Sequence, residues 1–262
     1  DVGSAMRQMP PVTSTLGQLA ILGVITVIVL FAIYIFSENP RPMKTQFFDG
    51  TLVGGNTKVF HQDPALKNSK TIYRSENEKG GIELCYDWWM MINQYPSNGQ
   101  STVFVKGDPS YDSSIHKNKV FSPAVVLQNR DGSNEMHVMF NTYATDNEEV
   151  VVKNMPIASW VHCAVVVKNR VIYVYVNGKL ARSQKVAGVI RQNYGILTVG
   201  PNRGFSGMIS NLTYRRRALE PIEIASIAAG SPNKQIIGIS SDLPPYISKS
   251  WYLGGGDVDY VN

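Results

Sequence analysis

Residues 16–36 form an uninterrupted run of twenty-one residues without a charged side chain, and this run constrains the chain more than any other feature. A helix rises about 1.5 Å per residue, so a helix of this length covers roughly 31 Å, about the hydrocarbon thickness of a bilayer. Fourteen of the residues are Leu, Ile, Val or Phe, and such residues favour insertion by about 0.3–0.6 kcal/mol each. We therefore expect a transmembrane helix whose membrane-spanning residues include Leu16, Leu22, Val27, Phe31 and Phe36.

Two other interpretations of this run fit less well. A buried helix of a globular core would normally be shorter or carry a polar stripe. A cleaved signal peptide would have a shorter apolar region, and residues 37–40 (SENP) follow this run without a small-x-small cleavage pattern. The chain after residue 36 is therefore expected to lie at a membrane surface.

The remaining segments differ in composition. Pro40 and Pro42 follow the apolar run closely, and proline stops a helix and favours extended backbone before it. After residue 230, Pro and Gly break any long element, yet aromatic residues are interspersed, which is unusual for a disordered tail. This tail is expected to become ordered on the domain itself or on a neighbouring subunit. The predicted organisation is a polar leader (1–15), a transmembrane helix (16–36), a linker (37–46), a β domain (47–230) and an extended C-terminal arm (231–262).

The pattern between residues 47 and 220 is one of short extended runs separated by turn residues. Asp131-Gly132 and Asn177-Gly178 each lie at the end of such a run, and these dipeptides are typical of tight β-hairpins. Strands at regular spacing favour an all-β antiparallel sandwich. One short helix is predicted over residues 221–227, because proline stands at its start and Gly230 follows it.

Charge and cysteine content exclude several classes of protein. The net charge of +5 is mild, and it suits an anionic lipid or an acidic protein surface better than nucleic acid. Cys85 and Cys163 both lie in strand-like runs and are expected to be buried free thiols, with a single disulfide as the alternative. Because the chain has no CxxC motif and no Cys/His cluster, a zinc site is not expected. No cofactor is predicted.

A set of ordered motifs resembles the concanavalin A-like lectin/glucanase superfamily, specifically its laminin-G-type domain. The motifs are residues 160–164 (WVHCA), 173–178 (YVYVNG), 197–200 (LTVG) and 205–212 (FSGMISNL), with residues 82–89 as an earlier strand. This resemblance implies a jelly-roll sandwich of two antiparallel sheets, with Trp160 filling the space between them and a structural role for His162. It implies little about function, because one fold serves many activities.

The resemblance implies two kinds of site that this fold can carry. Its glycoside hydrolases need two carboxylates about 5–9.5 Å apart, whereas Glu83 and Asp87 would stand about 13 Å apart along one strand. The chain is therefore predicted not to be an enzyme. Calcium sites are commoner in the family, and four loop acids could serve as ligands, although a role in turns and solvated loops explains them more simply. They are Asp108, Asp112, Asp131 and Asp146.

Several aromatic and basic side chains form a candidate interaction surface. One of two adjacent strand residues must point away from the core, so Trp88 or Trp89 could offer a stacking face. Arg215 and Arg217 point to the same side of a strand and could contact lipid headgroups or an acidic partner. The aromatic residues of the arm complete this candidate surface: Tyr246, Trp251 and Tyr252.

The leading functional hypothesis is a non-enzymatic, single-pass membrane protein that acts as a structural and interaction module. Its layout resembles minor capsid proteins of large icosahedral DNA viruses with an internal membrane. Its expected partners are therefore the lipid bilayer and neighbouring capsid or membrane-assembly proteins, with no nucleic acid, and its expected place is the virion's internal membrane beneath the capsid. The alternative is a membrane-anchored lectin or adhesion module that binds glycan, with or without calcium.

Overall fold

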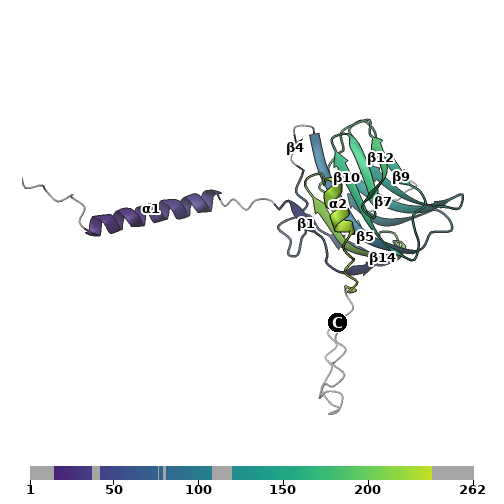
Figure 1. Cartoon of the computed structure of the whole chain (residues 1–262), viewed down its shortest axis with the longest axis horizontal. Helices are drawn as coiled ribbons and strands as arrows, with labels where there is room; N and C mark the ends of the chain where they lie inside the picture. Colours follow the sequence, from purple (N-terminus) through teal and green to yellow (C-terminus); the bar gives the residue numbers. More distant parts are fainter. Residues whose placement is uncertain (1–14, 37–41, 76, 79–80, 108–119, 238–262) are drawn as a thin grey trace, which may run out of the picture. The chain divides into compact units, whose positions relative to one another are not determined.

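The structure is a computed structural model that describes residues 15–36, 42–75, 77–78, 81–107 and 120–237 (Figure 1). The chain divides into two units, Asp1–Pro42 and Met43–Asn262. The first contains a single described helix, and the second contains a β-sandwich with one short helix. The leader and most of the predicted arm, residues 1–14 and 238–262, lie outside the described residues, as do the predicted surface residues Tyr246, Trp251 and Tyr252.

Helix α1 spans Thr15–Phe36, which confirms the helix expected over residues 16–36. Side chains of this helix are described from residue 21 to 33. Three of the predicted membrane-spanning residues, Leu22, Val27 and Phe31, are 63%, 65% and 62% exposed. Among the residues described in full, no helix is both long and apolar enough to cross a membrane. Membrane insertion therefore stays a prediction from the sequence.

The first sheet of the sandwich contains eight of the described strands, and all of its strand pairs are antiparallel. Its main order is β1-β14-β5-β10-β11-β12, with β2 paired to β14 and β4 to β5. The strands are β1 (Lys44–Gln46), β2 (Thr51–Val53), β4 (Asn77–Glu78), β5 (Gly81–Gln94), β10 (Trp160–Lys168), β11 (Val171–Val176), β12 (Lys179–Lys185) and β14 (Ser206–Arg215).

The second sheet contains the other six described strands, in the order β3-β13-β6-β7-β8-β9. The strands are β3 (Lys58–Phe60), β6 (Gln100–Gly107), β7 (Phe121–Arg130), β8 (Ser133–Phe140), β9 (Glu148–Val152) and β13 (Ile196–Val199). Within the described residues, every pairing in this sheet is also antiparallel. The predicted all-β antiparallel sandwich of jelly-roll type is therefore the observed fold.

The core lies between the two sheets because the strands alternate apolar side chains toward it. In β5 the even-numbered residues from Ile82 to Ile92 belong to the core cluster. Trp88, in the same series, is fully buried, and its ring lies 5.0 Å from that of Phe104 in an edge-to-face arrangement. Aromatic pairs of this geometry stabilise a core beyond simple burial, by about 0.5–1.5 kcal/mol. Trp160, by contrast, is only partly buried and lies outside the core cluster, so its predicted place between the sheets is wrong.

The two predicted hairpin turns are present. Asp131 and Gly132 have φ values of 53° and 78° between β7 and β8, and Asn177 and Gly178 have 49° and 76° between β11 and β12. Positive φ at both central residues defines the turn whose twist matches that of paired strands. This geometry explains Asp131 as a turn residue, which removes one of the four acids considered for calcium.

Helix α2 (Pro221–Ala228) covers part of the outer face of the eight-stranded sheet, as Figure 1 shows. Its Ile224 is buried in a second cluster with Cys85, Ala164 and Val166 from β5 and β10. The helix starts as the sequence predicts, with proline in its first turn, and Glu223 Oε2 accepts a hydrogen bond from the Glu220 N–H at 3.0 Å. That bond satisfies a backbone donor that a helix start leaves free.

The domain extends beyond both predicted boundaries. Strand β1 lies inside the expected linker and pairs with residues 213–215 of β14. At the other end, residues 231–237 of the expected arm lie against the domain itself. The Gln235 carbonyl accepts a hydrogen bond from the Thr51 N–H at 2.7 Å, and the Ile237 N–H donates to the Thr51 carbonyl at 2.8 Å. The sandwich therefore includes short segments at both ends whose placement depends on hydrogen bonds with residues distant in the chain.

Candidate functional site

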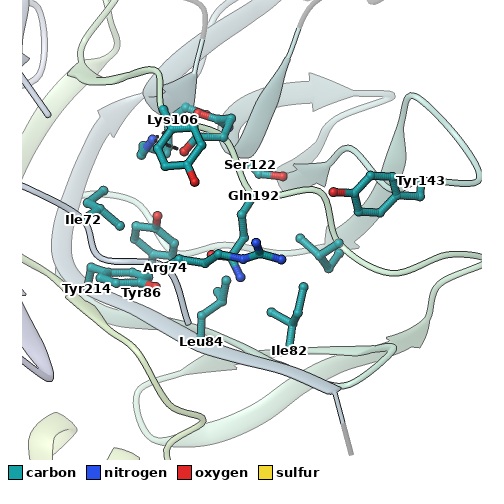
Figure 2. A pocket seen from close by; sticks show the side chains of 13 residues that line it. Ile72, Arg74, Ile82, Leu84, Tyr86, Lys106, Ser122, Tyr143, Gln192 and Tyr214 are labelled. Atoms are coloured by element: carbon teal, nitrogen blue, oxygen red, sulfur yellow. Dashed lines mark hydrogen bonds between the residues drawn. The ribbon is translucent and has the colours of Figure 1, made fainter. Parts of the chain in front are cut away.

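A pocket of about 150 Å³ lies between the two sheets at one end of the sandwich (Figure 2). The eight-stranded sheet contributes side chains of β5 and β14, the six-stranded sheet contributes the end of β6 and the start of β7, and three loops close the rim. The lining residues are Ile72, Arg74, Ile82, Leu84, Tyr86, Lys106, Ser122, Tyr143, Ile190, Gln192, Asn193, Tyr194 and Tyr214. Pockets with an apolar lining and a few convergent polar groups are the usual form of small-molecule sites.

Two glycines allow the loop at residues 190–195 to approach the end of β6. A Cβ atom on Gly195 would lie 2.6 Å from the Cα atom of Gly107, which no real side chain tolerates. Gly107 itself has a φ of 143°, and a Cβ there would lie 2.0 Å from the Val120 carbonyl oxygen. The absence of side chains at both positions therefore lets backbone pack on backbone and brings the loop over the pocket.

Lys106 is buried in this pocket, with 2% of its surface exposed. Its ammonium donates hydrogen bonds to the carbonyl and Oδ1 oxygens of Asn193, at 2.9 and 3.0 Å, and to the Gly195 carbonyl at 2.6 Å. All three acceptors are neutral, so burial lowers the pKa of Lys106 to about 8. The pocket therefore holds a positive charge that these contacts solvate without neutralising.

Other hydrogen-bonding groups of the pocket have no partner in the described structure. Ser122 is 7% exposed, and its Oγ atom makes no hydrogen bond. The side-chain nitrogen of Gln192 is buried and also unpartnered. Figure 2 shows the Arg74 side chain extending into the pocket beside Gln192. Because buried polar groups are nearly always hydrogen-bonded, unpartnered groups that face one pocket mark a place where water or a ligand binds.

The pocket is strongly asymmetric in charge. Arg74 and Lys106 are cationic, and the described lining contains no aspartate or glutamate. Neither cation forms a salt bridge within the described residues. The arrangement is therefore suited to a ligand that carries negative charge or several hydrogen-bond acceptors.

The structure does not support Trp88 and Trp89 as an interaction surface. Trp88 lies in the core between the sheets, and Trp89, on the opposite face of β5, is only 9% exposed. The Trp89 ring lies 5.2 Å from the ring of His162, which is fully buried on the same face. Both indoles are therefore too buried to serve as a stacking platform for a ligand in solvent.

Arg215 and Arg217 share one face of the sheet as predicted, but each has an acidic partner. Arg215 forms a salt bridge with Asp87, whose side chain is 6% exposed. Arg217 binds both carboxylate oxygens of Glu223 in α2, at 2.8 and 2.5 Å, and its hydrogen bonds lower the pKa of Glu223 to about 2. Arg215 therefore links β14 to β5, and Arg217 links the segment after β14 to α2. The two arginines do not form an unpaired basic patch.

The carboxylates considered for catalysis or metal binding are also accounted for. Asp87 pairs with Arg215, and Glu83 accepts a hydrogen bond from the Ala218 N–H at 3.4 Å, both away from the pocket. Among the described residues, no group of three His, Cys, Asp or Glu side chains is arranged to hold a metal ion. Asp108 and Asp112 lie outside the described residues.

Both cysteines are buried free thiols, as expected. Cys163 faces the core between the sheets, whereas Cys85 faces α2 on the other side of the same sheet. Because their side chains point to opposite faces, the alternative of a disulfide between them is wrong. Burial raises the pKa of both thiols, that of Cys85 to about 12, so neither is activated as a nucleophile.

The buried imidazole of His162 is expected to lower the free energy of unfolding at acid pH. Neither ring nitrogen has a hydrogen-bond partner in the described structure, and burial lowers its pKa from 6.5 to about 4. The unfolded chain therefore binds a proton that the folded chain does not, and stability falls as pH falls from 6.5 to 4, by about 3 kcal/mol. Urea unfolding at pH 7 and pH 4.5 measures this loss.

A His162→Phe variant is expected to lack that part of the pH dependence and to be at least as stable as the parent chain at pH 7. His61 is exposed, so His61→Gln serves as the matched control and should leave the pH profile unchanged. If His162→Phe lost stability with pH as steeply as the parent chain, the imidazole would not be the group that titrates.

No pocket residue was identified as a site residue from the sequence. Lys106 did carry a signal, because it follows the apolar strand run Val103-Phe104-Val105 and a lysine is rarely buried without partners. Arg74, Ser122 and Gln192 come from three separate segments, and no motif connects them. Only the pairing of the strands brings them together.

Comparisons with known proteins agree with this architecture. Residues 68–225, more than half of the chain, match a laminin-G-type family model described as the concanavalin A-like lectin/glucanases superfamily. No curated protein matches the chain significantly.

Among solved structures, the receptor binding domain of botulinum neurotoxin D is 12% identical, with a TM-score of 0.48, over 72% of this chain and 52% of that one. The botulinum neurotoxin serotype G binding domain is 13% identical, with a TM-score of 0.46, over 70% of this chain and 46% of that one. The chain therefore spans about half the length of these structures.

Proposed function

The chain belongs to the concanavalin A-like lectin/glucanases superfamily, and we propose that it is a non-enzymatic binding module attached to a membrane by residues 16–36. The observation that carries this proposal is α1, a helix of 22 residues without a charged side chain whose described apolar side chains are largely exposed. Apolar surface of this extent needs an apolar partner, and the length of the helix suits a bilayer.

In this proposal the sandwich and the C-terminal arm contact protein neighbours. The compact order of apolar helix, short proline-containing linker, sandwich and aromatic arm suits a minor capsid component that ties a protein shell to the internal membrane of a virion. Asp87 forms a salt bridge with Arg215, and Glu83 accepts a hydrogen bond from the Ala218 N–H. Both carboxylates therefore help to stabilise the fold, which supports a non-enzymatic role.

Membrane attachment predicts that the full chain remains with membranes after an alkaline wash. Replacing Val27 and Leu30 with lysine is expected to release most of the protein, because each charge near a helix centre costs about 2.5–3.5 kcal/mol of insertion free energy. Ser183→Lys, an exposed position on β12, is the control and should change nothing. Release of the parent chain by the wash would rule out the attachment.

A second candidate function is glycan binding, and the pocket is the specific observation that favours it. Sugars present hydroxyl groups for hydrogen bonding and C–H faces for packing, and the pocket combines unpartnered polar groups with aliphatic and tyrosine side chains. Tyr143 and Tyr194, on its rim, are 72% and 87% exposed.

A further inference from the structure

The size of the pocket limits its occupant to about one ring. Its volume of about 150 Å³ is close to that of a cavity that holds a single benzene-sized ring. Side chains of β5 (Ile82 and Leu84) form an apolar wall, with Ile72 and Ile190 beside it. A ligand that fits must therefore be small and must present at least one face of C–H groups.

The cationic side chains of the pocket require, in addition, an anionic group on the ligand. The Arg74 guanidinium has five N–H donors and no acidic partner in the described structure, and a carboxylate accepts two of them in parallel. The buried ammonium of Lys106, surrounded by neutral oxygens, adds a second positive charge to the same space. An anionic group would compensate both charges.

The unpartnered groups fit the remainder of such a ligand. Ser122 Oγ both donates and accepts, and the buried nitrogen of Gln192 donates. Hydroxyl groups on a ring supply acceptors and donors for both. The exposed ring of Tyr194, on the rim, offers a flat apolar face beside the opening.

We propose that this pocket binds one acidic monosaccharide unit, a pyranose ring that carries a carboxylate, such as a hexuronate. The carboxylate binds Arg74 within the field of Lys106, the ring hydroxyls bind Ser122 and Gln192, and the C–H face of the ring packs on the aliphatic wall. This inference rests on glycan binding, the second function proposed above, and narrows it to one class of sugar.

Ligand-observed NMR titration of the full chain in detergent micelles tests the proposal. The probes are glucuronate and galacturonate, the neutral sugars glucose and galactose, and the ring-free anions acetate and phosphate, all at constant ionic strength. The uronates are expected to bind saturably and about tenfold or more tightly than the neutral sugars, since the difference is a charge-assisted hydrogen-bonded pair.

Two variants place the binding in the pocket. Arg74→Gln should weaken uronate binding about tenfold or more, while leaving the weak binding of neutral sugars nearly unchanged. Arg74 is exposed, so this change should not affect folding, and thermal unfolding checks that. Ser122→Ala should weaken binding of both uronates and neutral sugars. Arg182→Gln removes another exposed arginine, on β12, and should have no effect.

The outcomes distinguish the inference from the function on which it rests. Equal binding of uronates and neutral sugars, lost on Ser122→Ala, would overturn the acidic specificity and leave glycan binding standing. Equal binding of acetate or phosphate would show an anion site that does not recognise the ring, and would overturn both. Absence of binding by every sugar would also overturn both, and uronate binding unaffected by Arg74→Gln would overturn the assignment to this pocket.

Discussion

Replacing Trp88 with alanine is expected to lower the free energy of unfolding by about 3–5 kcal/mol. The side chain is fully buried between the sheets and packs edge-to-face on Phe104. Truncation removes the transfer free energy of the indole and leaves a cavity that surrounding strands, fixed by their hydrogen bonds, fill only partly. Urea unfolding monitored by circular dichroism measures the loss.

Two further variants make this test specific. Tyr194 is an aromatic residue with 87% of its surface exposed, so Tyr194→Ala should change stability by no more than about 0.5 kcal/mol. Trp88→Phe should cost less than Trp88→Ala, because the ring contact with Phe104 persists and the unpartnered indole nitrogen is removed. A loss below about 1 kcal/mol for Trp88→Ala would contradict the position of the indole in the core.

Strand β5 shows which features the sequence predicts and which it does not. Alternation in residues 82–92 predicts that Trp88 and Trp89 face opposite sides of a sheet, and the structure agrees. Alternation does not predict which segment packs on the outer face of the sheet. The packing of Ile224 against Cys85 depends on a helix more than a hundred residues away, so the exposure of that face could not be derived locally.

Short strands were missed for a related reason. Thr45 and its two neighbours in β1 have no pattern of their own and become a strand only by pairing with residues 213–215. The Asn177-Gly178 turn, in contrast, is fixed by local backbone preferences and was predicted correctly. Features set by local propensity or alternation were therefore accessible, whereas features set by contacts between distant segments were not.

The pocket depends most strongly on contacts between distant segments. Arg74, Ser122 and Gln192 are far apart in the chain and share no motif. They converge only when both sheets have formed and packed together. Gly107 and Gly195 enable the convergence through close backbone approach. In the sequence each of these residues is an ordinary strand-end or loop residue, which explains why family motifs identified the fold and not the site.

Loss of the acidic partner of Arg215 is expected to destabilise the domain by about 3 kcal/mol in an Asp87→Asn variant. The Arg215 side chain is 15% exposed and that of Asp87 6%, so the variant leaves a largely buried guanidinium without a compensating charge. Coulomb attraction is little screened in such a place, and the cost of an unpaired buried charge exceeds the net contribution of the pair itself. Urea unfolding gives the difference directly.

A double-mutant cycle separates these two quantities. Combined with Arg215→Gln, Asp87→Asn should cost less than the two single losses together, by about 2–3 kcal/mol, because the second change removes the charge that the first left unpaired. The exposed pair of Lys168 and Glu220, with Nζ and Oε1 3.2 Å apart, provides the control cycle. Its coupling energy should be indistinguishable from zero within experimental error. Additive losses at Asp87 and Arg215 would mean that the two side chains act independently. Coupling would establish that the predicted basic face is a structural ion pair, because a free basic surface for lipid or protein would lose nothing when its neighbouring acid is neutralised.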